Sequence, residues 1–369
     1  MRFDSKSPLP LFLLALACGE ATHALGDGAG PLGAAGATSP DGNGDAASAG
    51  TGGNPPVIGD ACDEDSPPEL APPFASPEVV WQRISRFVAD AEREAPSALP
   101  DEVSPEWAGE IALAAFDREL EAQTAPAGMR RFIARWLSLP TEPEPALDRD
   151  WAAMAAADGA TLRTLLTFRE AGEPDRVGIF ADSFWLTEYE RIPRRASTMH
   201  RALNVNAAPL PPSEPTAFDV TPGMTAREWY VNEVSPPVCA GCHTVIDPYG
   251  FALEHFDEVG EYRETDGGKP VDASGWIVID DVEVSFTSIA DLAPRLAESC
   301  QAGRAVSQRF LADALLASGT AAEPVSGNLS HVVLAYPADE ARINRAFFAG
   351  GRTIRALVEG AARSEAMLR

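Results

Sequence analysis

Apolar residues recur at helical spacing over most of the chain after residue 75. Ser76-Pro77-Glu78 has the residue types of a helix start: a capping side chain, a proline at the first helical position and an acid in the first turn. Apolar side chains then repeat at intervals of three or four residues, at Val80, Ile84, Phe87 and Ala91. The pattern therefore predicts a first helix that begins at Pro77.

The same periodicity predicts further helices over residues 105–122, 129–140, 151–168, 225–234, 248–257, 289–317 and 340–369. Residues 207–222 are rich in proline, which predicts extended or irregular chain. One segment has a different pattern, because the short apolar runs Trp276–Ile279 and Val282–Val284 are separated by Asp280-Asp281, as in a small β-hairpin. The fold is therefore predicted to be mainly α with a minor β-hairpin.

The first residues have the pattern of an export signal. Arg2 and Lys6 precede an apolar run over residues 9–17, which is too short to span a bilayer. The run ends in small residues before Cys18, as in the cleavage box of bacterial lipoproteins. Residues 1–17 are therefore predicted to be a signal peptide, and Cys18 the lipidated first residue of an envelope-anchored protein. The alternative is an ordinary secretory signal with cleavage nearby.

Composition and charge separate a tether from the folded part and limit the partners. Residues 26–56 are dominated by Gly, Ala, Ser, Asp and Pro, so they have too little apolar surface to offset the entropy of ordering. The chain has 55 acidic and 29 basic residues and a formal net charge of -26. This charge argues against nucleic acid as a partner and suits a redox partner protein with a basic face.

Residues 239–243, Cys-Ala-Gly-Cys-His, have the sequence of a c-type haem attachment site. Two cysteines at this spacing can form thioether bonds to the two vinyl groups on one edge of the porphyrin. The adjacent histidine is then placed to ligate the iron. Cys239, Cys242 and His243 are therefore predicted to bind haem c, with His243 as one axial ligand.

Other interpretations of the motif stay open from the residues alone. A zinc site would need two more soft ligands, which Cys62 and Cys300 could supply. A thioredoxin-like pair would need a βαβ setting, which the pattern lacks. A chance CxxCH that binds nothing is the third alternative. If Cys62 and Cys300 are not ligands, these two leftover cysteines are candidates for a disulfide in an oxidising compartment.

The sequence leaves the sixth iron ligand unknown. Small cytochromes commonly use a methionine well downstream of the motif, and the candidate side chains in this chain are Met199, Met224, Met367, His200, His255 and His331. An open sixth position is equally allowed and would favour ligand binding or peroxidase-type chemistry. Arginines that could approach the haem propionates are Arg191, Arg194 and Arg195. Acidic residues expected to form a solvated rim are Asp247, Glu254, Asp257, Glu258 and Glu261.

Residues 239–263 carry a longer pattern around the motif. CxxCH is followed by Asp-Pro-x-Gly-Phe-x-Leu-Glu and then by Phe-Asp-x-x-Gly-x-x-Arg. This resembles the planctomycete-type cytochrome c family, secreted bacterial proteins built from consecutive domains of unknown function. A fainter resemblance extends over about four-fifths of the chain. It implies haem binding and electron transfer outside the cytoplasm, without a specific reaction. His255 departs from the family pattern, which has a small polar residue there.

These patterns divide the chain into a signal peptide (1–17), an anchor and tether (18–75), a helical domain (76–175), a cytochrome c-like haem segment with a hairpin (176–286) and a C-terminal helical domain (287–369). The predicted function is electron transfer by an envelope-anchored c-type haem protein. One alternative is a haem enzyme, a peroxidase or oxidase subunit, with an open sixth position. The other is a structural or interaction lipoprotein without haem.

Overall fold

The computed structural model describes residue 62 and residues 66–140, 145–169, 176–205, 222–235, 237–322 and 335–369. Within these ranges the chain is mainly helical with a small β-hairpin, as predicted, and it has a second two-stranded antiparallel sheet that was not predicted. No helix among them is both long enough and apolar enough to cross a membrane. The predicted signal peptide, Cys18 and His331 lie outside the described residues.

Helices α1, α2, α4 and α5 each begin after a residue whose side chain caps them, whereas α3 begins after Pro126 without such a cap. Their bounds are α1 (Pro77–Ala89), α2 (Pro105–Ala122), α3 (Ala127–Trp136), α4 (Trp151–Ala156) and α5 (Leu162–Thr167). Ser76 caps α1, since its Oγ accepts from the N–H of Val79, and Ser104 caps α2 in the same way. The predicted start of the first helix and the predicted bounds of the second are therefore confirmed.

The middle of the chain contains the short helix η1 (Ile179–Ala181), then α6 (Ser183–Glu188), α7 (Ile192–Leu203), α8 (Ala226–Val234) and α9 (Pro237–Phe251). Four short strands follow: β1 (Thr265–Asp266), β2 (Lys269–Pro270), β3 (Gly275–Ile279) and β4 (Val282–Phe286). The chain ends with α10 (Ile289–Glu298), α11 (Cys300–Ala317), α13 (Pro337–Ala349), α14 (Ile354–Ala362) and α15 (Glu365–Leu368).

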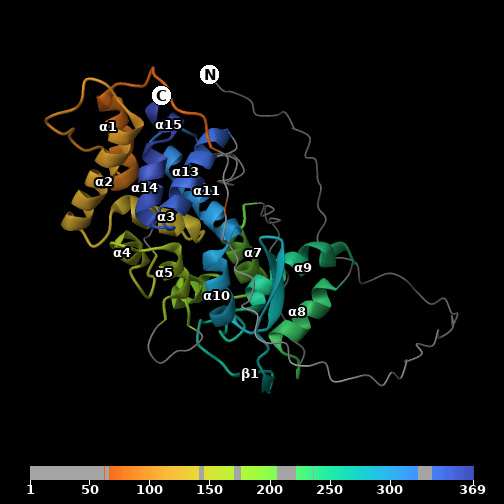
Figure 1. The fold of residues 1–369 in the computed structure, drawn as a ribbon. Coiled ribbons are helices and arrows are strands. Elements are labelled where there is room, and N and C mark those ends of the chain that lie inside the picture. Colours follow the sequence, from red (N-terminus) through yellow and green to blue (C-terminus); the bar gives the residue numbers. More distant parts are fainter. Residues whose placement is uncertain are drawn as a thin grey trace, which may run out of the picture.

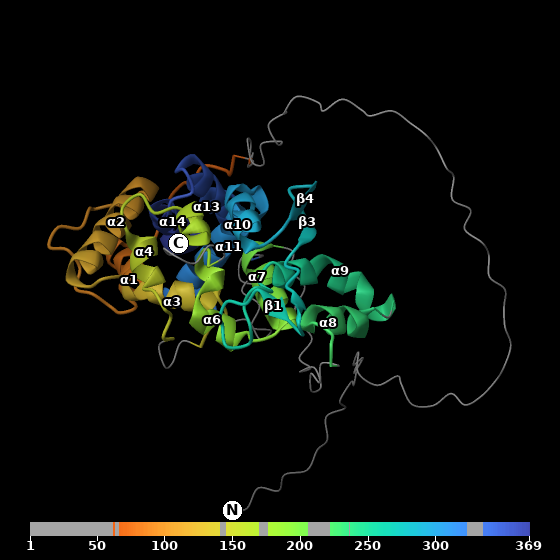
Figure 2. The same ribbon diagram turned by 90° about the horizontal axis from the view of Figure 1, so that it is seen from below.

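The two ends of the folded part pack together. Figure 1 shows α1 and α2 beside α13, α14 and α15, while α8 and α9 lie at the opposite end of the molecule. Figure 2 shows the same separation from below, with β3 and β4 next to α9. One cluster of buried apolar side chains runs from Val80 to Leu368, and all three predicted folded units contribute to it.

The predicted hairpin is formed by β3 and β4. Ile279 pairs with Val282 across a two-residue turn, in which Asp280 and Asp281 have φ angles of 50° and 62°. Positive φ at both turn positions matches the right-handed twist of the strands and favours Asp or Asn there. The side chains on the buried face of the hairpin are Ile277, Ile279, Val284 and Phe286.

Helix α9 contains the whole CxxCH motif, which corrects one prediction. Proline favours the first turn of a helix, so Pro248 was expected to begin a helix after the motif. Instead Pro248 lies inside α9, which runs without a break from Pro237 to Phe251. A proline here costs one backbone hydrogen bond. The close packing of α9 on α7, which includes Gly250 against the carbonyl oxygen of Ile192, outweighs that cost.

Two glycines of α9 should respond to alanine in opposite directions. A Cβ at Gly250 would lie 2.6 Å from the carbonyl oxygen of Ile192 and 2.9 Å from Cβ of Ala196. We therefore expect Gly250→Ala to lower the free energy of unfolding by about 1–3 kcal/mol. A Cβ at Gly241 would meet nothing within 4 Å. Gly241→Ala should therefore be neutral or stabilise by up to about 1 kcal/mol. Urea unfolding of both variants tests this, and equal effects would contradict the packing of α7 on α9.

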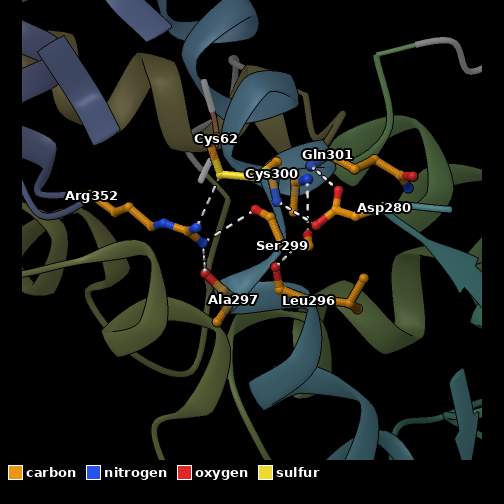
Figure 3. Close-up of a disulfide and its surroundings, with 9 residues drawn as sticks. Cys62, Asp280, Leu296, Ala297, Ser299, Cys300, Gln301 and Arg352 are labelled. Carbon is orange, nitrogen blue, oxygen red and sulfur yellow. Dashed lines mark hydrogen bonds between the residues drawn. A yellow bond between two sulfur atoms is a disulfide. The ribbon is translucent and has the colours of Figure 1, made fainter. Parts of the chain in front are cut away.

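A disulfide joins Cys62 to Cys300, with a Cα–Cα distance of 5.4 Å and 238 residues of separation. The pairing considered from the sequence is therefore confirmed. Figure 3 shows the bond at the start of α11, between the side chains of Arg352 and Asp280. Both carboxylate oxygens of Asp280 accept from the first N–H groups of α11, those of Cys300 and Gln301, at 2.8 Å. The hairpin turn thus caps the helix that carries the disulfide.

Candidate haem attachment site

The helical conformation of the motif places its three functional side chains together. Cys242 and His243 follow Cys239 by three and four residues, so all three lie within about 100° of the surface of α9. Cys239 is buried, Cys242 is exposed, and the side chain of His243 is 30% exposed. Gly241, Thr244 and Val245 are exposed beside them, so one side of this helix is open to solvent.

His243 is held through Nδ1. This nitrogen lies 3.0 and 3.1 Å from the two carboxylate oxygens of Asp247, one helical turn later on α9. The hydroxyl of Tyr230, on α8, lies 2.8 Å from the same nitrogen and donates to Oδ1 of Asp247 at 2.9 Å. Asp247 and Tyr230 are only 3% and 4% exposed. The imidazole orientation is therefore fixed by two buried partners.

This arrangement selects a tautomer of His243. A carboxylate only accepts hydrogen bonds, so Nδ1 carries the proton and Nε2 keeps its lone pair. Nε2 has no hydrogen-bond partner among the residues that the structure describes. Metal-bound histidines commonly donate their other ring N–H to a carboxylate in this way. Two thiols and an unengaged imidazole nitrogen on one side of a helix fit the chemistry of c-type haem attachment.

The zinc alternative lacks its other ligands. The sulfur atoms of Cys62 and Cys300 are bonded to each other, so they cannot join Cys239 and Cys242 around a metal. Within the described ranges, no group of three or more His, Cys, Asp or Glu side chains is arranged to hold a metal ion. Cys62 and Cys300 are therefore excluded as the further ligands that the zinc alternative requires.

Most candidates for the sixth ligand are engaged elsewhere in the fold. Met199 and Met367 are 1% and 0% exposed within the apolar core. His200 packs edge-on against Tyr249, and its Nε2 lies 3.1 Å from the side-chain amide of Asn204. Burial lowers the pKa of His200 to about 4, with a further contribution from Arg309.

His255 is also engaged. Its ring stacks on Tyr262 with the centroids 5.4 Å apart, and its Nδ1 donates to the carbonyl oxygen of Arg263 at 3.0 Å. Met224 is half-buried just before α8. The structure therefore brings none of these four engaged side chains, Met199, His200, His255 and Met367, to the motif as a ready ligand.

Several residues of the long pattern after the motif have structural roles. Oδ1 of Asp257 accepts from the N–H groups of Val259 and Glu261, at 3.0 and 2.9 Å, and so closes the loop after α9. Gly260 has a φ of 76° and a Cβ there would lie 3.0 Å from the carbonyl oxygen of Ser183. These residues shape the support for α9, whereas Asp247 of the same pattern lies within hydrogen-bond distance of His243.

Two predicted surface carboxylates are buried. Glu254 is 4% exposed and pairs with Arg263 at 3.6 Å, and Asp247 is buried beside His243. The predicted solvated acidic rim is therefore wrong for these two residues and holds for the exposed Glu258 and Glu261. Composition gives the number of charges but not the direction in which each side chain points.

Arg195 is also placed differently from the prediction. It is 2% exposed and donates to backbone carbonyl oxygens, those of Tyr189, Leu186 and Phe256 at 2.9, 3.1 and 2.6 Å and that of Asp257. Its donors are therefore not available for haem propionates. Arg191 lies 3.1 Å from Glu190 and forms an ion pair with it.

Glu254 should give the stability a specific pH dependence. Burial raises its pKa from 4.5 to about 7, despite the nearby Arg263 and Arg195. The folded protein therefore retains a proton that the unfolded chain releases. Its stability should fall by up to about 3 kcal/mol as the pH rises from about 4.5 to about 7. Thermal unfolding at several pH values should show this fall in the wild type and in the exposed variant Glu258→Gln. The fall should be absent in Glu254→Gln. If stability depended on pH in the same way in all three proteins, the assignment of this dependence to Glu254 would be contradicted.

Sequence reasoning missed Tyr230 as a partner of His243. Asp247 could have been found, because a carboxylate four residues after a histidine on one helix lies on the same face. Tyr230 comes from α8, and no local spacing relates it to the motif. Its contact follows from the packing of α8 against α9.

One comparison with known proteins finds a match in the middle of the chain. Residues 176–266 match the family described as PSCyt3, protein of unknown function (DUF1588), a planctomycete cytochrome c-associated domain family. The match covers about a quarter of the chain and includes α9 and the loop after it. Neither the curated proteins nor the solved structures include a significant match. The fainter resemblance of residues 76–175 and 287–369 stays a prediction.

Proposed function

We propose that this protein is a c-type haem protein that transfers electrons at the cell envelope. Cys239 and Cys242 would attach the haem through thioether bonds, and Nε2 of His243 would be an axial ligand of its iron. The haem would supply the one-electron chemistry when bound. The chain's own residues would fix its position, orient the imidazole through Asp247 and exclude water from one side of the histidine.

The observation that carries this proposal is the geometry of His243. Its Nδ1 lies 3.0 Å from Asp247 and its Nε2 is left unengaged, on the same side of α9 as two thiols. An imidazole held at Nδ1 by a buried carboxylate, which leaves the Nε2 lone pair available, is the arrangement common among metal-bound histidines. The match of residues 176–266 to a cytochrome c-associated family agrees with this assignment.

The proposed location rests on other features. An export signal over residues 1–17 and a lipidated Cys18 would place the folded part outside the cytoplasm, on the tether over residues 18–75. The Cys62–Cys300 disulfide is the kind of bond that persists in such an oxidising compartment. With a net charge of -26, a redox partner protein with a basic face is the partner we propose.

The cysteine variants test the attachment directly. The protein is made in a bacterial host with c-type maturation machinery, and its alkaline pyridine haemochrome spectrum is recorded. We expect a c-type α band in the wild type and its loss in Cys239→Ala/Cys242→Ala, because both thioether bonds are gone. The matched control is Cys62→Ala/Cys300→Ala, which removes two cysteines away from α9 and should keep the band. A wild type without the band would refute the haem assignment.

A haem enzyme with an open sixth position is the second candidate, and one observation favours it. Among the described residues, Met199, Met367, His200 and His255 are buried or engaged away from the motif. An open position predicts that the ferrous protein binds carbon monoxide readily. A strong sixth ligand predicts slow or incomplete binding, which would favour simple electron transfer.

A further inference from the structure

We infer that Asp247 and Tyr230 are positioning residues that set the donor strength of His243: Asp247 lowers the reduction potential of the haem iron, and Tyr230 offsets part of that effect. This inference rests on the proposed function, because it concerns the imidazole that would ligate the iron. Neither residue would touch the iron or the porphyrin-bound sulfurs, since both act on the far nitrogen of the ring. The inference therefore concerns tuning of the site and not attachment of the haem.

The contact between Asp247 and His243 is built into the fold. The two residues are four apart on α9, so the helix backbone itself maintains their separation. Both carboxylate oxygens lie within 3.1 Å of Nδ1. The side chain of Asp247 is only 5% exposed, so water competes little for these oxygens. A hydrogen bond to a carboxylate is stronger in such a poorly solvated place than at the surface.

A carboxylate acceptor changes what the other ring nitrogen does. It draws the Nδ1 proton toward itself and adds electron density to the ring, which makes Nε2 a more basic ligand. A more basic ligand, with a negative charge behind it, stabilises ferric iron more than ferrous iron. The one-electron reduction potential is therefore lower than it would be with a neutral acceptor at Nδ1.

Tyr230 acts in the opposite direction. Its hydroxyl donates to Oδ1 of Asp247 at 2.9 Å and so takes up part of the negative charge that would otherwise act on the imidazole. Tyr230 is 4% exposed, and its ring also contacts His243 edge-on with the centroids 5.9 Å apart. Removing the hydroxyl while keeping the ring should therefore strengthen the hydrogen bond between Asp247 and His243.

The test compares Asp247→Asn, Tyr230→Phe and a charge-matched control. Asp281→Asn is the control, because it removes one carboxylate at an exposed turn position where asparagine is equally suited to the φ of 62°. Each haem-loaded protein is titrated potentiometrically against mediator dyes. The iron–histidine stretching band of the ferrous form is recorded by resonance Raman spectroscopy.

Asp247→Asn should shift the equilibrium between ferric and ferrous haem about tenfold toward the ferrous form. That is a rise of about 59 mV for a one-electron couple. Its iron–histidine band should move to lower frequency. Tyr230→Phe should lower the potential, and Asp281→Asn should match the wild type.

The outcomes separate this inference from the proposed function. A wild type without haem c overturns the proposed function, and this inference with it. Haem c in place, with Asp247→Asn and Asp281→Asn at the same potential and with the same Raman band, overturns this inference alone. If Asp247→Asn does not retain haem, Tyr230→Phe decides, because a potential equal to or above that of the wild type overturns the inference.

Discussion

Arg195→Leu should lower the free energy of unfolding by about 3 kcal/mol or more. The wild-type guanidinium donates to four backbone carbonyl oxygens, two near the end of α6 and two in the loop after α9, and Arg195 is only 2% exposed. Leucine would remove the donor from the carbonyls of Leu186, Tyr189 and Phe256, whereas that of Asp257 also accepts from the N–H of Gly260 at 3.2 Å. Each buried group left unsatisfied costs about 1–3 kcal/mol. The summed loss of about 3 kcal/mol or more is a large part of a typical folding free energy of about 5–15 kcal/mol.

Arg195→Lys should destabilise the protein as well. Lysine keeps the charge, but its single nitrogen cannot reach the four carbonyl oxygens that surround the planar guanidinium group of Arg195. We expect a loss of at least about 2 kcal/mol by urea unfolding followed by circular dichroism. The control is Arg191→Lys, just before the same helix. Arg191 is half-buried and forms an ion pair with Glu190, so this substitution should change the free energy of unfolding by less than about 0.5 kcal/mol. Equal midpoints for the variants of Arg195 and Arg191 would contradict the assigned role.

Removing the Cys62–Cys300 disulfide should cause the second large loss. The bond closes a loop with 238 residues of sequence separation, and loop-closure entropy predicts a stabilisation of about 5–6 kcal/mol. We expect Cys62→Ala/Cys300→Ala to lower the melting temperature by about 10–15 °C. The bond also ties the end of the predicted tether to α11, next to the hairpin turn at Asp280.

Reduction provides the control for the disulfide prediction. A reductant should lower the melting temperature of the wild type to that of the double alanine variant. The reductant should leave the melting temperature of the variant unchanged, because the variant lacks Cys62 and Cys300 and the described residues contain no other disulfide. A stabilising role would be contradicted if the reductant did not lower the melting temperature of the wild type, or if the variant had the same melting temperature as the oxidised wild type.

Local signals in the sequence predicted much of the secondary structure. Ser76-Pro77 and Ser104-Pro105 mark helix starts that the structure confirms, because capping side chains satisfy the first N–H groups of a helix wherever it packs. The hairpin was predictable for a similar reason, since the turn residues Asp280 and Asp281 tolerate positive φ.

Features that depend on packing were not predictable. Pro248 was expected to start a helix, and only contacts between α7 and α9 explain why the helix continues through it. Asp247 and Glu254 look like other surface acids in the sequence, because their burial depends on Tyr230, His243 and Arg263 from other turns or elements. The three proposed attachment residues could be named from the sequence because their motif lies within five consecutive positions.

The most direct test of the central claim is the mass of the peptide that contains Cys239 and Cys242. The protein is matured in a host that attaches c-type haem, denatured, digested and analysed by mass spectrometry. Attachment predicts that this peptide retains a porphyrin through denaturation, while the peptides with Cys62 and Cys300 are joined by their disulfide. A peptide recovered with two unmodified thiols, from a host that loads a control cytochrome, would contradict the assignment of a haem protein.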